Sequence, residues 1–428
     1  MMKNLDILQV IKERCIRAYV NTMHPILLSH VAKKVGKKDK IEVVFFAMNV
    51  PMWRYEGVYK LLSMDNRFNC HIVLTVNSLV PKDSQAEELQ RLRQYFKSKG
   101  INFIDHEMQD TNGYDVRKNI NPDILFYPQH YGRMHPENHN YTHFLSKLLC
   151  YIPYGLSALS SRNWSWEYDL TFQNFAWKLY YPFSYNKKES EAVSKNHARN
   201  MVISGYPNMD YYLNDTVNDV WKLPTQSHKR LIWAPHFTIA DSSALNRSNF
   251  LQMSQLMLDV AESFRDKLQI AFKPHPRLKL ELYMHPEWGK EKTDLYYNKW
   301  AGMENTMLET GDFIDLFKSS DAMIHDSDSF MIEYLFVNKP VSYIVKDEKT
   351  LQKELSDFGH EILNQHYLVK DKEEIISFIE NVVLGGNDTK CEQRTEFLNK
   401  QLMPNINGTT SQFIVNDIKR SLGIEVDG

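Results

Sequence analysis

The sequence predicts an α/β protein of two Rossmann-like domains that face a central cleft. Through most of the 428 residues, short apolar runs alternate with segments of helical periodicity. This is the pattern of parallel strands joined by helical crossovers. A polar stretch at about 208–229, which contains Pro224, separates one such alternation from a second. Several apolar runs end abruptly in polar residues, as buried strands do at the carboxyl edge of a parallel sheet.

The composition excludes several classes of protein. The content of 43% hydrophobic and 24% charged residues is that of a soluble globular protein. The net charge of −2 supplies no overall positive field for binding nucleic acid. No apolar run reaches the roughly 18 residues of a membrane span, and the N-terminus has no signal-peptide pattern, so we expect a cytoplasmic protein. The four cysteines have no CxxC pair, which argues against a zinc site or a disulfide scaffold; they are Cys15, Cys70, Cys150 and Cys391.

The first domain is expected over residues 1–207. Its opening segment, about 5–35, has helical spacing and is followed by a run of lysines between positions 33 and 40. Such a helix either lies on an anionic membrane surface or packs on the domain with solvated lysines. The tract 160–200, rich in Trp and Tyr, carries no assignment. Helices are expected at 53–64 and 84–99, and strands at 41–48, 71–76, 101–104, 122–127, 148–152 and 201–204.

A linker at 208–229 leads to the second domain, expected over residues 230–428. Strands are predicted at 231–234, 268–272, 322–325 and 341–345. Helices are predicted at 249–265, 330–337, 372–384 and 410–421, and the last two are expected to close this domain.

Three strands of the second domain end in residues suited to a nucleotide diphosphate. The first is followed by His236 and Thr238, the second by Lys273 and His275, and the third by the polar stretch from Asp326 to Glu333. Because the carboxyl ends of parallel strands meet at one edge of a sheet, we expect these side chains to form a donor-binding site.

The stretch after the third strand has its own chemistry. Backbone N–H groups at a strand-to-helix turn favour phosphate, and the hydroxyls of Ser327 and Ser329 add donors. Asp328 lies between them, and Glu333 is expected two turns along the helix, where a carboxylate suits ribose hydroxyls. The structural alternative is ordinary capping of the helix by Asp or Ser.

The two prolines that flank His275 restrict its backbone, so that its imidazole can donate to a phosphate oxygen or carry a proton. His236 follows another proline, and Thr238 can assist it as a hydroxyl donor.

These motifs, in this order, resemble those of the CDP-glycerol glycerophosphotransferase family, whose members build teichoic acids and related capsular polymers on a scaffold called GT-B. The resemblance covers about residues 230–345, and Trp53-Arg54-Tyr55-Glu56 and Gly205-Tyr206-Pro207 are also similar to the family. The motifs that carry it are Trp233-Ala234-Pro235, Lys273-Pro274-His275-Pro276, and Asp326…Ser329…Glu333 followed by Lys339-Pro340-Val341.

The resemblance implies roles for these residues. His275 would contact the donor pyrophosphate, Ser327 and Ser329 would hold phosphate or the glycerol portion, and Glu333 would bind the ribose. An acceptor hydroxyl would attack the β-phosphorus of CDP-glycerol and expel CMP, a reaction that depends mainly on positioning and charge neutralisation.

It also implies partners. The donor would be a CDP-alditol, and the acceptor a lipid-linked or polysaccharide molecule at the cytoplasmic face of the membrane, with no nucleic acid involved. No cofactor is expected, although Mg²⁺ can accompany the donor diphosphate.

The chain departs from the family at three places. Members carry an Arg shortly after Trp-Ala-Pro, where this chain has Thr238, and their paired serines appear here as Asp328-Ser329. Their catalytic base is a His in a Trp-His-Gly-Thr turn, where this chain has Tyr154 within Ile152-Pro153-Tyr154-Gly155. Tyr is a poor base at its usual pKa of about 10. The base is therefore expected to be His130 or His135, unless the acceptor or the alditol differs. The candidate catalytic residues are His275, His130 and Tyr154.

Two other interpretations stay open. One is a glycosyltransferase that uses a nucleotide sugar, in which Glu333 still binds ribose but attack falls on the anomeric carbon. The other is a non-catalytic GT-B protein that scaffolds a synthase, which the missing Trp-His-Gly turn favours. Release of CMP from CDP-glycerol would distinguish a glycerophosphotransferase from both of these alternatives.

Overall fold

The chain folds into two compact α/β units. The computed structural model describes residues 2–105, 113–159, 167–214, 216–239, 247–311, 313–403 and 408–426, with side chains from residue 11 onward. Unit 1 comprises Met1–Gly155, Ser161–Asp210 and Pro404–Gly428, and unit 2 comprises Leu156–Ser160 and Tyr211–Met403.

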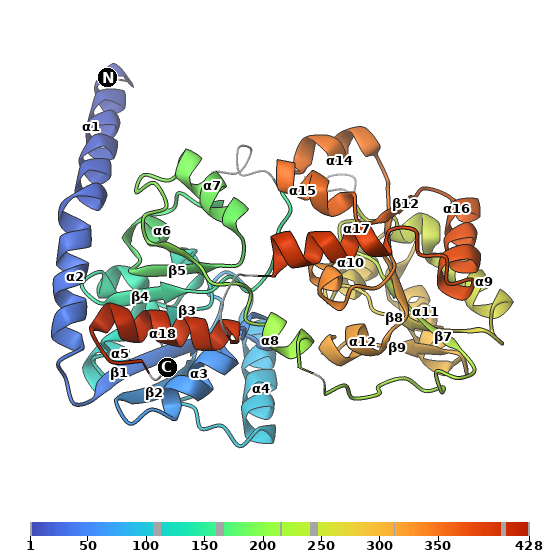
Figure 1. Cartoon of the computed structure of the whole chain (residues 1–428), viewed down its shortest axis with the longest axis horizontal. Coiled ribbons are helices and arrows are strands. Elements are labelled where there is room, and N and C mark those ends of the chain that lie inside the picture. Colours follow the sequence, from blue (N-terminus) through green and yellow to red (C-terminus); the bar gives the residue numbers. More distant parts are fainter. Residues whose placement is uncertain are drawn as a thin grey trace. The chain divides into compact units, whose positions relative to one another are not determined.

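Unit 1 is built on a parallel sheet with the strand order β2-β1-β3-β4-β5-β6 (Figure 1). Its strands are β1 (Ile41–Ala47), β2 (Phe68–Leu74), β3 (Ile124–Tyr127), β4 (Leu148–Tyr151), β5 (Lys178–Tyr181) and β6 (Met201–Ile203). Its helices include α1 (Met2–Asn21), α2 (Met23–Val35), α3 (Glu56–Ser63), α4 (Lys82–Ser98), α5 (Val116–Asn119), α6 (Thr171–Phe175), α7 (Ser184–Val193) and α18 (Thr410–Leu422). The short helix α8 (Met209–Tyr212) spans the junction between the units.

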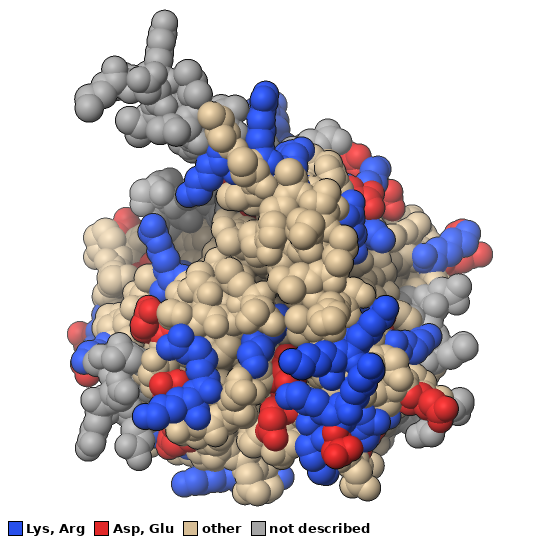
Figure 2. All heavy atoms as spheres, turned by 90° about the vertical axis from the view of Figure 1, so that its left-hand side faces the viewer, with Lys and Arg blue, Asp and Glu red and all other residues tan. Residues whose placement is uncertain are grey.

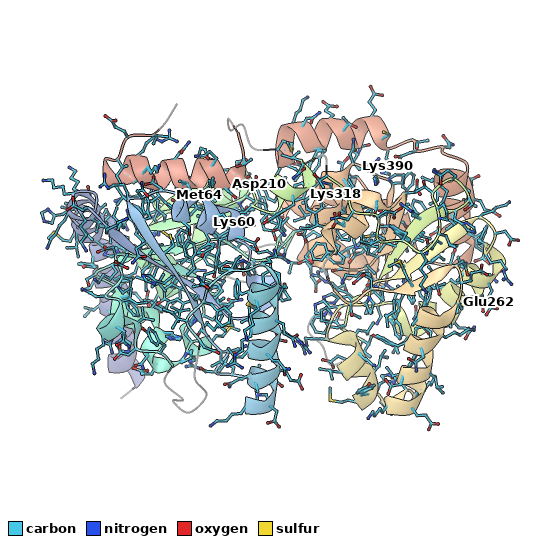
Figure 3. The ribbon with its side chains drawn as sticks, turned by 90° about the horizontal axis from the view of Figure 1, so that it is seen from below. Lys60, Met64, Asp210, Glu262, Lys318 and Lys390 are labelled. Atoms are coloured by element: carbon cyan, nitrogen blue, oxygen red, sulfur yellow. The ribbon has the colours of Figure 1, made fainter. Side chains whose placement is uncertain are left out.

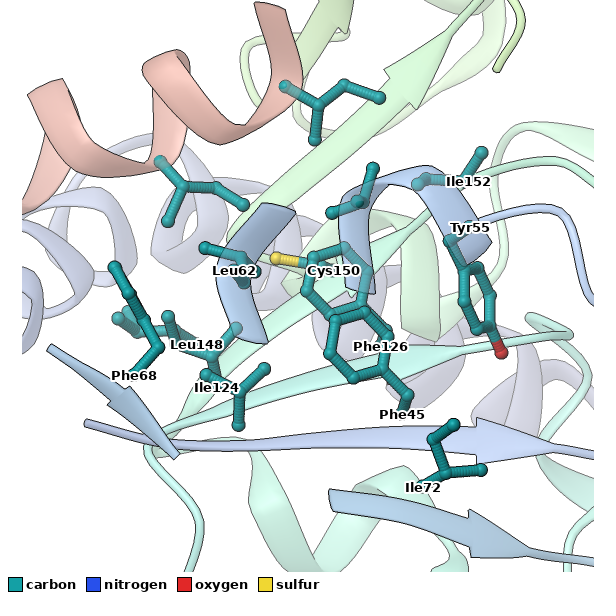
Figure 4. Packing of buried hydrophobic residues seen from close by; sticks show 14 of the residues in the cluster. Phe45, Tyr55, Leu62, Phe68, Ile72, Ile124, Phe126, Leu148, Cys150 and Ile152 are labelled. Carbon is teal, nitrogen blue, oxygen red and sulfur yellow. The ribbon is translucent and has the colours of Figure 1, made fainter. Parts of the chain in front are cut away.

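The sheet of unit 1 is buried on both faces. Successive residues of a strand point to opposite faces, so Val43 and Phe45 pack in one apolar cluster while Val44 and Phe46 pack in another. In the first cluster the Phe45 ring stacks on that of Phe126, with centroids 4.5 Å apart (Figure 4). Burial on both faces explains why the central strands read as continuous apolar runs.

Helix α18 packs on unit 1, not on unit 2, so the prediction that the C-terminal helices close the second domain is wrong for this helix. Its apolar stripe joins the unit 1 core beside α2 and α3 (Figure 1) and comprises Ile414, Val415, Ile418 and Leu422. The Asp210 carboxylate, labelled in Figure 3, accepts hydrogen bonds from the backbone N–H groups of Thr410 and Ser411 at 2.7 and 3.0 Å. Tyr180 and Lys178 of β5 hold Asp417 at 2.9 Å each. The apolar stripe thus decides the partner of this helix.

Unit 2 has a parallel sheet with the order β12-β11-β10-β7-β8-β9. Taken in chain order, this is the Rossmann arrangement 3-2-1-4-5-6, in which the order reverses between β7 and β10. The strands are β7 (Lys229–Ala234), β8 (Leu268–Phe272), β9 (Thr306–Leu308), β10 (Ala322–His325), β11 (Val341–Ile344) and β12 (Tyr367–Val369).

Helices cover this second sheet over an aromatic core. The Trp233 ring lies 5.0 Å from that of Phe272 and 5.5 Å from that of Trp300, between centroids. The helices are α9 (Phe250–Ser263), α10 (Leu278–Met284), α11 (Gly289–Gly302), α12 (Ile314–Ser319), α13 (Asp328–Glu333), α14 (Glu348–Glu354), α15 (Asp357–Leu363), α16 (Lys372–Ser377) and α17 (Cys391–Phe397).

A short segment from the first half of the sequence, Leu156–Ser160, belongs to unit 2. The carbonyl oxygen of Ala158 accepts hydrogen bonds from the backbone N–H and the hydroxyl of Ser356 at 2.9 and 3.0 Å. Leu159 forms an antiparallel bridge with Leu355. A Cβ on Gly359 would lie 2.3 Å from the Ala158 oxygen, so this close approach requires glycine.

The α/β class and most strands that were predicted are present. Strands β5, β9 and β12 were missed, and the predicted strand at 101–104 contributes only one bridge, between Ile104 and Val73. In the described residues, no helix is long and apolar enough to cross a membrane.

We expect Gly36→Ala to destabilise unit 1. A Cβ at this position would lie 1.8 Å from the Leu422 carbonyl oxygen, so α2 and the end of α18 must separate. Overpacking of this kind costs roughly 1–3 kcal/mol and lowers Tm by several degrees. Calorimetry checks this against Gly302→Ala, whose Cβ would meet nothing within 4 Å; equal Tm values for the two variants would contradict the packing described.

Candidate donor site and acceptor-side residues

The predicted donor residues of unit 2 follow β7, β8 and β10, around the point where the strand order reverses. Ligands of open α/β sheets bind at the carboxyl edge of the strands near such a point. A surface cavity at the opposite, amino-terminal edge is lined by Leu223, His228, Arg265, Asp266, Glu304 and Asn305. Its place before the strands puts it away from all the predicted donor residues.

Asp326, which follows β10, is hydrogen-bonded to the connection that follows β7. Its side chain is 1% exposed. Its two oxygens accept hydrogen bonds from the backbone N–H groups of His236 and Asn249, each at 2.6 Å. Burial raises the pKa of this carboxyl to about 6, and the two N–H groups oppose that shift. Asp326 therefore positions the start of α9 and the loop after β7, which carries the candidate donor residues His236 and Thr238.

His275 has a defined tautomer. Its Nδ1 lies 3.1 Å from the backbone nitrogen of Arg277, and a backbone N–H can only donate. The neutral imidazole therefore carries its hydrogen on Nε2. Burial, with Arg277 and Lys273 nearby, lowers the pKa of His275 to about 4. An uncharged ring with Nε2–H suits donation to a phosphate oxygen better than it suits proton abstraction.

His236 lies beside His275, with ring centroids 5.2 Å apart in an edge-to-face arrangement. Its Nδ1 is 2.9 Å from the Thr238 hydroxyl, so the predicted pair of these residues is present. Burial, with His275 and Arg247 nearby, lowers the pKa of His236 to about 3. Both imidazoles are neutral at pH 7.

Lys273 places a positive charge near His275. Its side chain is buried, and Nζ donates to the carbonyl oxygen of Gly311 at 2.8 Å. The guanidinium of Arg277 lies over the Phe237 ring at 4.2 Å, and that ring is 4.4 Å from His275. Sequence reasoning missed Arg277 and Phe237, although both adjoin motif residues.

The turn after β10 agrees in part with expectation. Ser327 is the N-cap residue of α13, but its side chain makes no capping hydrogen bond, so the structural alternative of capping by this serine does not hold. Ser329 lies half-buried two residues later, and Glu333 is buried at the end of α13. Asp328 accepts a hydrogen bond from the Ser157 hydroxyl at 3.1 Å, and burial raises the pKa of its carboxyl.

A partly buried ion pair beside this turn was also missed. Arg247 is 7% exposed, and its Nε and Nη2 lie 3.0 and 2.5 Å from one oxygen of Glu354. Its Nη1 lies 3.7 Å from an oxygen of Asp328. The partners are 107 residues apart in the sequence, so no local pattern could have indicated the pair.

The acceptor-side candidates gather in unit 1. His130 is buried, with Nδ1 3.2 Å from the Tyr151 hydroxyl, and burial lowers its pKa to about 3. His135 is also buried. Its Nε2 lies 3.0 Å from the carbonyl oxygen of Gln129, and burial lowers its pKa to about 4. At such pKa values both imidazoles are weak bases.

Tyr154 is 38% exposed, and burial together with the Glu167 carboxylate raises the pKa of its phenol. Its carbonyl oxygen accepts hydrogen bonds from the Tyr206 hydroxyl at 2.9 Å and from Arg54 Nε at 3.3 Å. Two motifs of the first half thus hold this loop. Glu56, which belongs to the first of these motifs, is buried and has a structural role. Its carboxylate accepts hydrogen bonds from Trp53 and Tyr95 and forms ion pairs with Lys60 and Lys99.

Among the residues that the structure describes, no group of three His, Cys, Asp or Glu side chains is placed to hold a metal ion.

We expect the stability of unit 1 to fall as pH decreases below about 6.5. In the unfolded chain His130 and His135 have pKa values near 6.5. Their folded pKa values are about 3 and about 4, so acid favours the unfolded chain. The loss is about 1.4 kcal/mol per pH unit for each imidazole. Between pH 7.5 and 5.5, Tm should fall less in the double variant His130→Gln, His135→Gln than in the wild type. An equal fall in both proteins would refute the conclusion that the two imidazoles are neutral in the folded protein.

Known proteins resemble this chain in sequence and in fold. Residues 169–420 match the family model described as CDP-Glycerol:Poly(glycerophosphate) glycerophosphotransferase. No curated protein matches the sequence.

Among solved structures, the Wall Teichoic Acid Polymerase TagF is similar at a TM-score of 0.59 and 13% identity, over 99% of this chain and 97% of that chain. A UDP-GlcNAc 2-epimerase from Neisseria meningitidis bound to UDP-GlcNAc is similar at 0.57 and 15%, over 89% and 100%. A putative UDP-N-acetylglucosamine 2-epimerase from Listeria monocytogenes is similar at 0.56 and 17%, over 89% and 96%. At these identities the likeness concerns the fold, which is the α/β fold of GT-B proteins.

The family match covers more than half of the chain, including β5, β6, all of the donor residues and helix α18 up to residue 420. His130, His135 and Tyr154 precede it. The chain belongs to the CDP-glycerol:poly(glycerophosphate) glycerophosphotransferase family.

Proposed function

We propose that the protein transfers glycerol phosphate, or a related alditol phosphate, from a CDP-alditol donor to a hydroxyl of a cell-surface polymer and releases CMP. The observation that carries this proposal is the family match over the donor residues that follow β7, β8 and β10. The acceptor is a lipid-linked or polysaccharide molecule.

In the reaction, an acceptor hydroxyl oxygen attacks the β-phosphorus, which carries the glycerol. A new P–O bond forms, the bond from that phosphorus to the bridging oxygen breaks, and CMP leaves with the oxygen. The hydroxyl proton passes to a base or to water. Charge on the diphosphate must be neutralised while this happens.

The donor side offers groups for each part of this task. His275 presents Nε2–H for a phosphate oxygen, and His236 lies beside it. Arg277 supplies positive charge near both rings, and Lys273 supplies it near His275. Ser327 and Ser329 add hydroxyls for phosphate or glycerol, and Glu333 is assigned to the ribose. Mg²⁺ enters, if at all, with the donor diphosphate.

We expect His275→Ala to weaken CDP-glycerol binding by about tenfold or more, since a hydrogen bond to a charged group contributes about 1.5–3 kcal/mol. Isothermal calorimetry measures this with CDP-glycerol, CDP-ribitol, CMP and a UDP-sugar. The control is His228→Ala, which precedes β7 at the opposite edge of the sheet.

Binding of a UDP-sugar in place of every cytidine compound would favour a glycosyltransferase. If the protein binds none of these donors, the scaffold interpretation gains support. That interpretation is also favoured by Tyr154, which stands where other members of the family have a histidine. A donor affinity that is equal in wild type and His275→Ala would remove this histidine from the site.

We further propose that the protein works at the cytoplasmic face of the membrane and contacts it through α1 and α2. Residues 1–40 contain nine basic and three acidic residues, a formal charge of +6 in a chain whose net charge is −2. Met23 and Ile26 are 62% and 66% exposed on the same helices. Figure 2 faces this side and shows many Lys and Arg side chains gathered there. Basic residues beside exposed apolar ones favour an anionic lipid surface.

Co-sedimentation with vesicles of phosphatidylglycerol and phosphatidylcholine tests this surface. We expect Met23→Ser with Ile26→Ser, and separately Lys33→Glu with Lys34→Glu, to reduce the bound fraction, because one pair supplies apolar contact and the other charge. The matched control is Leu280→Ser with Met284→Ser, which are also exposed but lie on α10. Equal binding by all of these proteins would show that the membrane contact lies elsewhere.

A further inference from the structure

The loops after β3 and β4 in unit 1 bring together a set of uncharged polar side chains. We call it the Tyr–His cluster; its members are Gln129, His130, Tyr131, His135, Tyr151 and Tyr154. Residues 129–135 follow β3, while Tyr151 ends β4 and Tyr154 follows it. Strands β3 and β4 are neighbours, with Tyr127 paired to Tyr151, so the loops emerge side by side at the carboxyl edge of the sheet.

Contacts within the cluster are close. The His130 ring lies 4.0 Å from that of Tyr131 and 5.3 Å from that of Tyr151, between centroids. The side chains of Gln129 and Tyr154 are also close enough to interact. Tyr131 is half-buried and Tyr154 is exposed, so these two form the outer part of the cluster, whereas Gln129, His130 and His135 are buried.

Three buried polar atoms of this cluster have no hydrogen-bond partner in the described part of the chain. They are Gln129 Oε1, His130 Nε2 and His135 Nδ1. The residues are 2%, 3% and 4% exposed. Buried polar atoms in native proteins are normally paired, so an unpaired one needs a partner from outside the chain, such as a water, an ion or a ligand, or has a functional role. Three within seven residues of sequence point to a ligand site.

The chemistry of these atoms selects the ligand. His135 Nε2 must donate to the Gln129 carbonyl, which can only accept, so Nδ1 carries a lone pair. Gln129 Oε1 is an acceptor as well. Both atoms therefore need a ligand that donates hydrogen bonds, as a hydroxyl does and an ionised phosphodiester does not. By contrast, both nitrogens of nearby His139 are paired, with Thr75 at 2.7 Å and the Tyr114 carbonyl at 3.0 Å.

The charge around the cluster favours the same class of ligand. Its imidazoles are neutral, because burial lowers both pKa values, and its phenols are neutral, because burial raises theirs. The Glu167 carboxylate adds to the rise for Tyr131, Tyr151 and Tyr154, so a negative charge lies close by. The Arg54 guanidinium touches the backbone oxygen of Tyr154. Aromatic rings beside hydrogen-bonding groups suit the face and the hydroxyls of a sugar.

From these observations we propose that the Tyr–His cluster is the acceptor site, and that it takes the neutral hydroxyl-rich end of a sugar or polyol rather than a phosphate-bearing chain end. This inference rests on the proposed transfer to a hydroxyl. It implies that the protein adds alditol phosphate to a glycoside, as in starting or decorating a polymer. His135 and Gln129 would hold the acceptor by accepting from its hydroxyls.

Saturation-transfer NMR on the full chain tests the site directly, with an alkyl N-acetylglucosaminide as the neutral probe and oligo(glycerol phosphate) as the anionic one. We expect the glycoside to bind and the oligomer not to bind. His135→Leu should weaken glycoside binding about tenfold or more, because a hydroxyl of the bound glycoside would lose its buried hydrogen-bond partner. His135→Asn should restore part of it, since its amide oxygen can replace the Nδ1 acceptor. The control is His143→Ala, whose partner is Glu137.

A second assay separates this inference from the proposed function. CDP-glycerol affinity, measured on the same preparations, should be equal in wild type and His135→Leu, and the glycoside should stimulate CMP release. Lack of CDP-glycerol binding by the wild type would refute the proposed function while leaving glycoside binding measurable. Stimulation by the oligomer alone, binding of neither probe, or equal binding by His135→Leu and His135→Asn would overturn the acceptor assignment.

Discussion

The carboxyl edge of the sheet in unit 2 depends on one buried carboxylate. Asp326 directly follows β10, and its carboxylate accepts hydrogen bonds from the backbone N–H groups of His236, after β7, and Asn249, before α9. The carboxylate follows β10 and its two donors follow β7, so these hydrogen bonds cross the point where the strand order of unit 2 reverses. A charged residue in an apolar setting is costly unless it is hydrogen-bonded. The two short bonds offset that cost and determine where the loop carrying His236 can lie.

Desolvation then decides what the histidines can do. Burial keeps the imidazoles of His275 and His135 neutral, and in each case a backbone partner selects the nitrogen that carries hydrogen. The Arg277 N–H leaves His275 with a donor, whereas the Gln129 carbonyl leaves His135 with an acceptor. One residue type is therefore suited to a phosphate in unit 2 and to a hydroxyl in unit 1. The difference comes from one backbone contact in each case.

Much of the fold was predictable, because strands buried on both faces read as apolar runs and their ends read as polar motifs. The failures have physical causes. β9 and β12 are three residues long, too short for a periodic signal, and β5 lies in an aromatic tract whose rings suit strand and core alike. Helix α18 has an amphipathic pattern that indicates a helix but not its partner. Arg247 and Glu354 pair across 107 residues.

The sequence by itself determined the α/β class, the order of the elements and the residue types at the strand ends, since these follow from local periodicity and spacing. Family membership also follows from residues 169–420. Tertiary structure alone decided that α18 completes unit 1, that Asp326 positions neighbouring loops, and which nitrogen of His275 and His135 bears hydrogen. Each of these depends on backbone groups that folding brings together from distant positions or turns to a particular angle. The identity of a side chain does not determine which of these backbone groups it contacts.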